Sequence, residues 1–377
     1  METDMKTTIY MVRHCESEGN ACRRSQARFD GIVTRKGLEQ AQVLSDHFKN
    51  MPITAIYSSD AYRCRATAEP LSKATGLPVQ YRMMLREYTI GAWEGYSIGY
   101  TANRFPGLYE RWLATPYDHN IPGADPFWLA AERGYLGIQQ IAAENPGGTV
   151  VAITHSCTLN CALTKVLGQP ISYYGSVKSG DNTAITMLEV DEEGNIEAKY
   201  INDDSHLPDH LLRKNYTGRG AATNFDFHPL VFPRDEEKLA AILDTMAKEL
   251  PGLYDADAIK ASSALALSQN EKFSMLATLP DRVTGLITVR KDQTLPAGHG
   301  LLDTLWVVED LREKGYTEQA MGEAIDLLRR SGCRYLVVKE SNEPHTQLLL
   351  GRFCFEPMGQ GLHRMAITVP GLDEPVY

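Results

Sequence analysis

The sequence lacks long hydrophobic runs. None of its apolar stretches approaches the ~20 residues that a transmembrane helix needs. The amino terminus, Met-Glu-Thr-Asp-Met-Lys, is acidic and contains no apolar signal segment. Internal repeats and low-complexity tracts are missing as well. These absences predict a cytoplasmic protein with no membrane partner.

Paired cysteines and an excess of positive charge are missing too. The seven cysteines are scattered, odd in number and never spaced as CxxC, so we expect reduced thiols and no disulfide framework. Lysine and arginine total 38 against 48 acidic residues, which gives a net charge of -10. This balance argues against nucleic acid as a partner, because backbone phosphates would be repelled. Small anionic substrates stay possible, since local arginines decide their binding.

The remaining composition, with 43% hydrophobic and 23% charged residues, is that of a globular protein. A chain of 377 residues is too long for one ordinary core, so two or three domains are expected. Two different patterns divide the chain. We predict a first domain over residues 1–210, a polar, glycine-containing linker over 211–225, and a second domain over 226–377.

The first half alternates short apolar strands with helical stretches. This alternation predicts an α/β domain with a mostly parallel sheet and flanking crossover helices. The expected strands are Thr7–Val12, Thr54–Ser58, Thr149–Thr154 and Thr183–Val190, and a tight turn then leads into a closing strand over Ile196–Ile201.

An arginine and a histidine, Arg13 and His14, stand where the first predicted strand ends and polar, helix-starting residues begin. In open α/β sheets, ligands bind at this edge, where helix amino termini offer free N–H groups to anions. Arginine holds phosphoryl oxygens in its rigid fork, and a neutral histidine can attack phosphorus. The pair therefore suggests a nucleophile facing a phosphate. The alternative is a surface Arg-His pair that closes a loop, because it would have the same two residues in the sequence.

Further segments extend this pattern. Ser58–Arg63 follows the second strand, Leu85–Gly95 contains Glu87 and ends in Trp-Glu-Gly, and Thr154-His155-Ser156 follows a third strand. Together with Arg13–Ser17 and the polar tail Asn202–Leu207, these segments resemble, in the same order, the motifs of the histidine phosphatase superfamily, which has the phosphoglycerate mutase-like fold. A cysteine follows the histidine where that family usually has glycine.

The resemblance implies a role for each residue of the set. His14 would be the nucleophile that becomes phosphorylated, and Glu87 would be the acid and base. The phosphate would be held by Arg13, Asn20, Arg63 and a protonated His155. This chemistry needs no metal and no cofactor, and its substrate would be a small phosphorylated metabolite. Glu94 is a rival carboxylate, but its place in the family pattern is structural.

Two reactions use this residue set. Mutases of the family resemble Glu-Arg-His-Tyr-Gly around the acid, where this chain has Glu87-Tyr-Thr-Ile-Gly. The Trp93–Gly95 ending is more similar to phosphatases, so hydrolysis is favoured. The alternative is mutase-type phosphotransfer, which would need a bisphosphate to prime His14.

Three features near this set have two interpretations each. The insert Tyr96–Asn145 is rich in aromatic residues, which either line a lid over a ring-bearing substrate or simply pack the insert. Arg23, Arg24 and Arg28 either meet a second anionic group or form a solvated helix face. Cysteines follow close on His14 and His155, but their spacing fits no usual zinc site and small buried thiols are favoured.

The second half begins a new pattern near Phe225. The expected elements are a strand His228–Phe232, a helix opened by Pro233, a hairpin of Lys272–Thr278 with Val283–Arg290, a strand Leu301–Val308, a helix Glu318–Arg330 and a strand Arg334–Lys339. This order predicts an α+β domain.

The stretch from Trp306 to Met321 resembles the acyl-CoA loop of GNAT N-acetyltransferases. Arg312 and Gly315 match the family pattern, whereas Thr317 stands where a small residue is usual. The resemblance implies that this loop binds the pyrophosphate of acetyl-CoA or a related acyl-CoA at the start of a helix. The tyrosine that often serves as general acid in the family is missing, so whether the second domain is an N-acetyltransferase stays open. A further alternative for the whole protein is a noncatalytic regulator whose second domain senses acyl-CoA.

Overall fold

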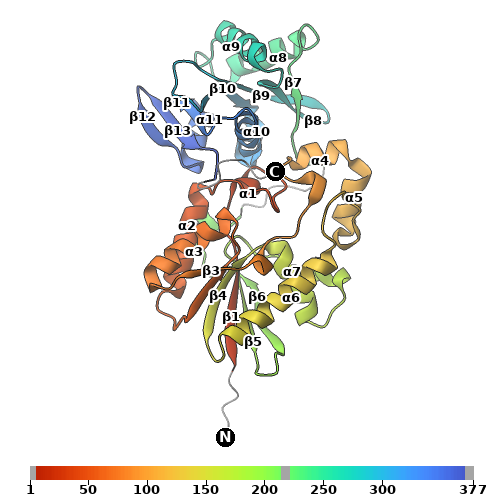
Figure 1. Cartoon of the computed structure of the whole chain (residues 1–377). Helices are drawn as coiled ribbons and strands as arrows, with labels where there is room; N and C mark the ends of the chain where they lie inside the picture. Colours follow the sequence, from red (N-terminus) through yellow and green to blue (C-terminus); the bar gives the residue numbers. More distant parts are fainter. Residues whose placement is uncertain (1–5, 214–220, 370–377) are drawn as a thin grey trace.

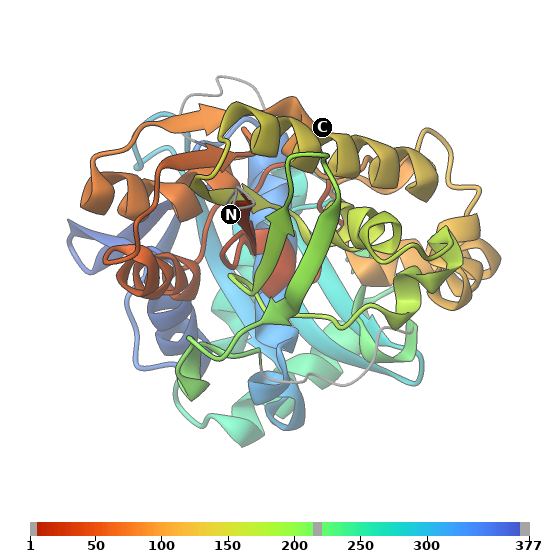
Figure 2. The ribbon, with the colours of Figure 1, turned by 90° about the horizontal axis from the view of Figure 1, so that it is seen from below.

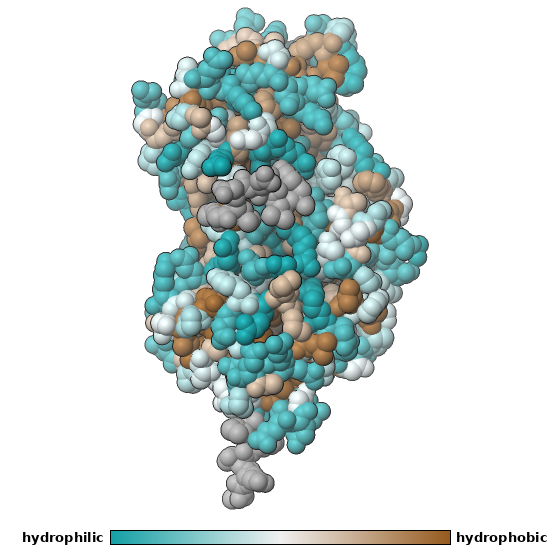
Figure 3. Space-filling view, in the orientation of Figure 1, coloured by the Kyte–Doolittle hydropathy of each residue, from teal (hydrophilic) through white to brown (hydrophobic). Residues whose placement is uncertain are grey.

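The computed structural model of the protein describes residues 6–213 and 221–369, and it has two lobes joined at a narrower waist (Figures 1 and 3). The face shown in Figure 3 is mostly hydrophilic, with apolar side chains in small scattered groups. Within the described ranges, no helix combines the length and the apolar character needed to cross a bilayer.

The first lobe is built on a six-stranded sheet with the order β3-β2-β4-β1-β5-β6. The first four strands in this order run parallel to one another. The last two form an antiparallel hairpin at one edge, next to β1. The strands are β1 (Thr7–Arg13), β2 (Ala55–Ser58), β3 (Val79–Tyr81), β4 (Thr149–Thr154), β5 (Ile185–Val190) and β6 (Ile196–Asp203). In the β1–β4 register Arg13 lies opposite Thr154, so the residues that follow these strands are neighbours.

Helices cover both faces of this sheet (Figure 2). One face packs against α2 (Arg35–Phe48) and α3 (Tyr62–Thr75), and the other packs against α6 (Phe127–Glu144) and α7 (Ser156–Val166). The period-two alternation of β1 allows this, because Ile9 and Met11 face α6 and α7 while Val12 faces the other layer. The short helices α1 (Glu18–Ala21), α4 (Ile98–Arg104) and α5 (Pro106–Ala114) lie toward the waist or beside it.

The second lobe has a seven-stranded sheet with the order β12-β13-β11-β10-β9-β8-β7. Its strands are β7 (Asp226–Pro229), β8 (Ser274–Leu279), β9 (Arg282–Arg290), β10 (His299–Val307), β11 (Tyr335–Lys339), β12 (Glu356–Gly359) and β13 (Leu362–Ala366). Its helices are α8 (Glu236–Glu249), α9 (Ala256–Gln269), α10 (Tyr316–Arg330) and α11 (Pro344–Arg352). The predicted fold class, an α/β domain followed by an α+β domain, is confirmed.

Most predicted strands lie where they were expected, but one does not. We predicted a strand over His228–Phe232, whereas β7 pairs with β8 only as far as Pro229. Past that point the chain turns, and the Val231 N–H donates to the Asp235 carboxylate at the start of α8 and not to a neighbouring strand. The predicted linker, 211–225, lies partly outside the described residues, as do the outer ends of the predicted domains 1–210 and 226–377.

The lobes share a hydrophobic core at the waist. Cys22 and Ile32 of the first lobe belong to the same buried cluster as Ala320 and Met321 of α10. Figure 1 shows α1 at this junction, directly below α10. Gly322 permits the close approach, because a Cβ atom there would lie 2.4 Å from the Cβ of Cys22. The segment that follows His14 is thus covered by the second lobe.

Candidate active site

His14 lies at the carboxyl end of β1 with its ring in a fixed orientation. Its backbone N–H donates to the Thr154 carbonyl at 2.9 Å, which continues the β1–β4 pairing by one residue. Its Nδ1 lies 2.7 Å from the Cys15 carbonyl oxygen, and only a protonated Nδ1 can donate to that acceptor. The lone pair of the neutral ring is therefore on Nε2, the nitrogen available for attack.

The surroundings of His14 keep its imidazole neutral. The side chain is buried, and burial together with the charges of Arg63 and Arg13 lowers its pKa well below the usual value. A lowered pKa leaves the base unprotonated at neutral pH and somewhat below it. His14 is therefore ready to act as a nucleophile without first losing a proton.

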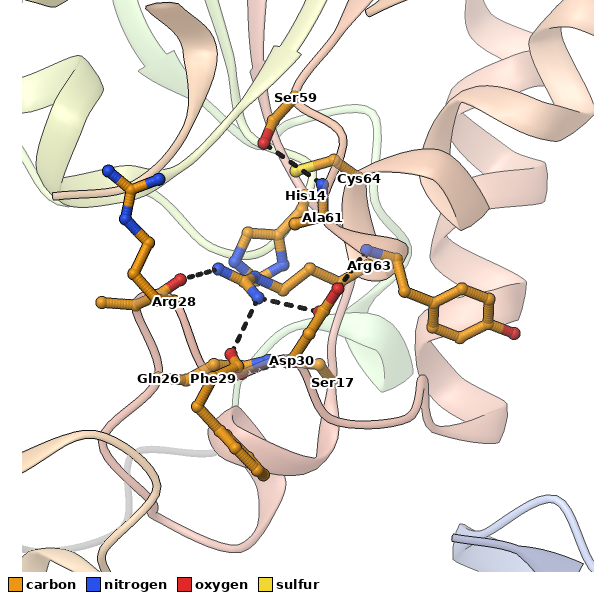
Figure 4. A network of polar contacts seen from close by, with 12 residues as sticks. His14, Ser17, Gln26, Arg28, Phe29, Asp30, Ser59, Ala61, Arg63 and Cys64 are labelled. Atoms are coloured by element: carbon orange, nitrogen blue, oxygen red, sulfur yellow. Dashed lines mark hydrogen bonds and ion pairs between the residues drawn. The ribbon is translucent and has the colours of Figure 1, made fainter. Parts of the chain in front are cut away.

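Arg63 is the most deeply buried cation beside His14. Its Nη1 donates to Asp30 at 2.9 Å, and its Nη2 donates to the Ala27 carbonyl at 2.8 Å (Figure 4). Its Nε is buried and has no hydrogen-bond acceptor among the described residues. A buried donor without an acceptor is costly, so this N–H is the kind of group that an anionic ligand would satisfy.

His155 follows β4 and packs against His14, with the ring centroids 5.3 Å apart. Its Nδ1 accepts from Arg63 Nη2 at 3.0 Å, and its Nε2 lies 2.9 Å from Ser59 Oγ. We expected a protonated His155. Its pKa is instead lowered by burial and by Arg63 and His14, so the ring is neutral and serves as an acceptor for the arginine.

Arg13 and Asn20 are held by the loop before β5. Arg13 Nη1 donates to the Gly180 carbonyl at 3.0 Å. Asn182 donates to the Asn20 side-chain oxygen at 3.1 Å and to the His14 carbonyl at 2.9 Å. Since the oxygen of Asn20 is already occupied, its amide nitrogen is the group left to face an anion.

Glu87 lies at the amino terminus of α7. Its carboxylate accepts from the N–H groups of Cys157 and Thr158 and from the Thr158 hydroxyl, at 2.8–3.2 Å. Helix amino termini stabilise negative charge, so this position suits a carboxylate that must also exist ionised. Arg133 of α6 holds the segment from outside by donating to the carbonyls of Arg86 and Glu87.

A cavity of about 980 Å³ brings most of these groups to one space. Arg13, His14, Asn20 and Glu87 line it, whereas Arg63 and His155 are buried beside His14 and are not among the lining residues. An uncharged aromatic wall, which we define as Tyr88, Trp93, Tyr109, Trp112, Phe127 and Tyr174, forms one side. The second lobe forms another side with Arg312, Glu313, Glu318, Leu348, Gly351 and Arg352.

The insert divides between its two interpretations, whereas Arg24 of the arginine cluster fits neither of the two given for it. Tyr109 and Trp112 of the insert line the cavity, but Tyr96 and Tyr100 stack on one another with centroids 4.5 Å apart, and Trp128 is 62% exposed. Arg24 forms no solvated face, because it is buried against the second lobe.

Several positioning residues were missed from the sequence. Asp30 holds Arg63, Asn182 links His14 to Asn20, and Arg133 fixes the backbone at Glu87. Asn182 follows Asp181 just before a predicted strand, and that polar pair at a strand entrance was the available signal. Asp30 lies in an irregular segment and Arg133 lies within the insert, on α6, and neither belongs to a motif that the sequence analysis used.

The cysteines near the site are buried and carry no disulfide. Burial raises the pKa of the Cys15 thiol to about 12, which suppresses its reactivity. Among the described residues, no group of three or more His, Cys, Asp or Glu side chains is arranged to hold a metal ion. That the reaction needs no metal stays a prediction.

Comparison with known proteins gives the family. A model of the histidine phosphatase superfamily (branch 1) matches residues 9–204, more than half of the chain. The chain belongs to this superfamily. A second model, of the acetyltransferase (GNAT) family, matches residues 239–351. Both predicted resemblances are thus confirmed, within one chain.

Individual relatives cover about half of this chain. A protein of Salmonella choleraesuis (strain SC-B67) described as "Probable phosphoglycerate mutase GpmB" is 29% identical over 162 residues, which is 43% of this chain and 75% of that protein. The solved structure of Bacillus stearothermophilus YhfR is 28% identical with a TM-score of 0.51, and covers 53% of this chain and 98% of its own. "Mycobacterial hydrolase 2", at 21% identity and a TM-score of 0.50 over 55% and 95% of the two chains, shares the fold.

The GNAT-like domain places its predicted loop residues together, but they do not fit a pyrophosphate as they stand. Gly315 adopts the left-handed turn, with φ of 81°, before α10. Arg312, however, forms an ion pair with Glu249 and donates to the Val307 carbonyl at 3.0 Å, and the buried Thr317 hydroxyl bonds the Arg312 carbonyl. A second cavity, of about 540 Å³, lies at this loop. Its charged wall residues are Glu309, Asp310, Glu313, Arg312 and Lys314.

Proposed function

We propose that the first domain hydrolyses phosphomonoesters through a phosphohistidine on His14 and needs no metal ion. The orientation of His14 is the observation that carries this proposal. Its Nδ1–H is fixed on the Cys15 carbonyl, its pKa is lowered by burial and by two arginines, and its Nε2 therefore keeps a lone pair beside donors suited to a phosphate.

In the first half-reaction, His14 Nε2 attacks phosphorus and the bond from phosphorus to the ester oxygen breaks. The leaving alkoxide takes a proton from Glu87. The guanidinium groups of Arg13 and Arg63 stabilise the charge on the phosphoryl oxygens, which is usually the largest contribution to the rate. The buried Arg63 Nε supplies one donor that no described protein group satisfies.

In the second half-reaction, the ionised Glu87 takes a proton from a water molecule, whose oxygen attacks the phosphorus. The bond from phosphorus to Nε2 breaks, inorganic phosphate leaves, and Glu87 is protonated again. The N–H groups at the start of α7 stabilise the carboxylate that this step requires. One carboxyl group thus serves as acid and then as base.

Hydrolysis of a ring-bearing phosphomonoester is favoured over mutase-type transfer. The relative described as a probable phosphoglycerate mutase supports transfer as the alternative. A phosphoglycerate is small and carries a second anionic group, whereas the aromatic wall beside Glu87 consists of uncharged side chains. Such a wall suits an apolar or ring portion of a small phosphorylated metabolite.

We expect the full-length protein to hydrolyse p-nitrophenyl phosphate at the same rate with and without EDTA, since the proposed steps use only side chains. Phosphate release is the measurement, and a panel of phosphorylated metabolites should show higher kcat/KM for ring-bearing esters than for 3-phosphoglycerate. Loss of turnover in EDTA with recovery on adding a divalent metal would contradict the proposal. Isomerisation of 3-phosphoglycerate that depends on a bisphosphate primer would instead establish the mutase.

Acyl-CoA binding by the second domain is a prediction of the GNAT resemblance. Because Arg312 must first leave Glu249, we expect calorimetry on the full-length protein to give a dissociation constant for acetyl-CoA of about 1 mM or weaker. Gly315→Val would keep the pyrophosphate from approaching the loop backbone, so it should abolish the heat of acetyl-CoA binding. Micromolar binding would contradict this expectation, and acetyl-CoA binding by a protein without phosphatase turnover would favour the regulator alternative.

A further inference from the structure

We propose that the GNAT-like domain is a positioning element of the phosphatase site, acting through two buried ion pairs, Arg329 with Glu18 and Asp326 with Arg24. Both pairs join α10 to the segment 18–30, which we call the binding loop. The inference rests on the proposed function, because it concerns how that loop holds Arg63 for a phosphate.

The first pair grips the start of the binding loop. Arg329 Nη1 donates to Glu18 Oε1 at 3.1 Å, and Nη2 donates to Oε2 at 2.5 Å. The side chains are 3% and 0% exposed, and the carboxylate, only four residues from His14, takes its hydrogen-bonded counter-charge from the other domain. Arg329 Nε is anchored in turn on the Ile367 carbonyl at 2.6 Å.

The second pair grips the middle of the binding loop. Arg24 Nη2 lies 2.9 Å from Asp326, and Nη1 donates to Glu323 and to the Gly322 carbonyl, both at 3.2 Å. Burial alone would lower the pKa of Arg24, but the two carboxylates raise it above its ordinary value. Arg24 Nε donates to the Gly95 carbonyl at 2.8 Å, which ties the same side chain to the phosphatase domain.

After its residues in these two ion pairs, the binding loop supplies the hydrogen-bond acceptors that orient Arg63. The carbonyls of Ala27 and Phe29 and the carboxylate of Asp30 accept from its two Nη atoms (Figure 4). Glu94 holds the N–H groups of the same stretch from the other side. A shift of the loop therefore moves the guanidinium away from His14 and His155.

The junction allows little independent movement of the loop. Cys22 packs so closely on Gly322 that no Cβ fits there. A third ion pair, between Arg352 of α11 and Glu16, lies beside the first, with Nη2 2.9 Å from the carboxylate. Buried ion pairs contribute little net stability, but breaking one by removing a single partner leaves an uncompensated charge that displaces its surroundings.

The test compares Glu18→Gln, Arg329→Gln and the double variant in the full-length protein. Each single variant should lower kcat/KM for p-nitrophenyl phosphate by about 10²-fold, as small misplacements of catalytic groups do. The KM and the inhibition constant of inorganic phosphate should rise together, because Arg63 binds the phosphate. The double variant, which leaves no unpaired charge, should recover most of the loss, and Arg329→Lys should lie between wild type and Arg329→Gln.

Leu243→Ala, in the second-domain core away from the junction, is the matched control. It should lower the melting temperature and leave kcat/KM unchanged. The proposal is overturned if the folded single variants keep kcat/KM within twofold of wild type, if the single losses multiply in the double variant, or if Leu243→Ala has the same kinetic effect. Absence of turnover in the wild type would instead overturn the proposed function, which separates the two failures.

Discussion

Replacing His14 by Asn should remove phosphomonoesterase turnover by about 10⁴-fold or more, the range seen when a covalent nucleophile is lost. The amide can still donate toward the Cys15 carbonyl, but it has no nucleophilic nitrogen where Nε2 lies. Rapid quenching in alkali, with a ³²P-labelled substrate, should trap acid-labile phosphate on the wild type and none on His14→Asn. The label measures the intermediate itself, independent of the assay for released product.

His363→Ala is the matched control, because it removes a histidine from β13 in the other domain. It should keep both the label and the turnover. Wild-type turnover without any trapped label, together with an active His14→Asn protein, would assign the reaction to a direct attack by water and end the phosphohistidine proposal.

Glu87→Gln should separate substrates by their leaving groups. The amide keeps the size of the carboxyl group but cannot donate its proton to an alkoxide, so hydrolysis of alkyl phosphates should fall by about 10²–10⁴-fold. p-Nitrophenyl phosphate should lose much less in the phosphorylation step, because nitrophenolate leaves without protonation. Single-turnover rates of phosphohistidine formation on the two substrates measure this difference.

Glu94→Gln gives the comparison for Glu87. Its carboxylate accepts from the N–H groups of Arg28, Phe29 and Ile90, so it orders the loop and touches no leaving group in the proposed steps. Glu94→Gln should therefore lower the rates of phosphohistidine formation from the alkyl phosphate and from p-nitrophenyl phosphate by the same factor. Equal losses in Glu87→Gln would likewise assign Glu87 to binding and remove it from the proton transfer.

The sequence by itself determined the order of the elements and where the candidate site residues of the first domain lie along it. A parallel strand is short, apolar and followed by its ligand-binding residues, so the pattern places Arg13 and His14 after one strand and His155 after another. Their meeting then follows from strand adjacency, and the register of β1 with β4 makes them neighbours. The motif Leu85–Gly95, which resembles a family pattern, predicted Glu87 as a site residue. Gly315 predicted the turn that precedes α10 in the second domain.

Only the tertiary structure decided what the charges around these motifs do. Glu18 and Arg24 have the letters of a solvated loop, yet both are buried against α10, and Glu18 meets an arginine 311 positions away. Arg312 matches an acyl-CoA loop in sequence but is paired with Glu249 in space. The local sequence pattern predicts helices, strands and turns, because these depend on the spacing of apolar residues and on turn-forming residues. The partner of a long charged side chain depends instead on which surfaces pack together in the fold, and no spacing along the chain encodes that.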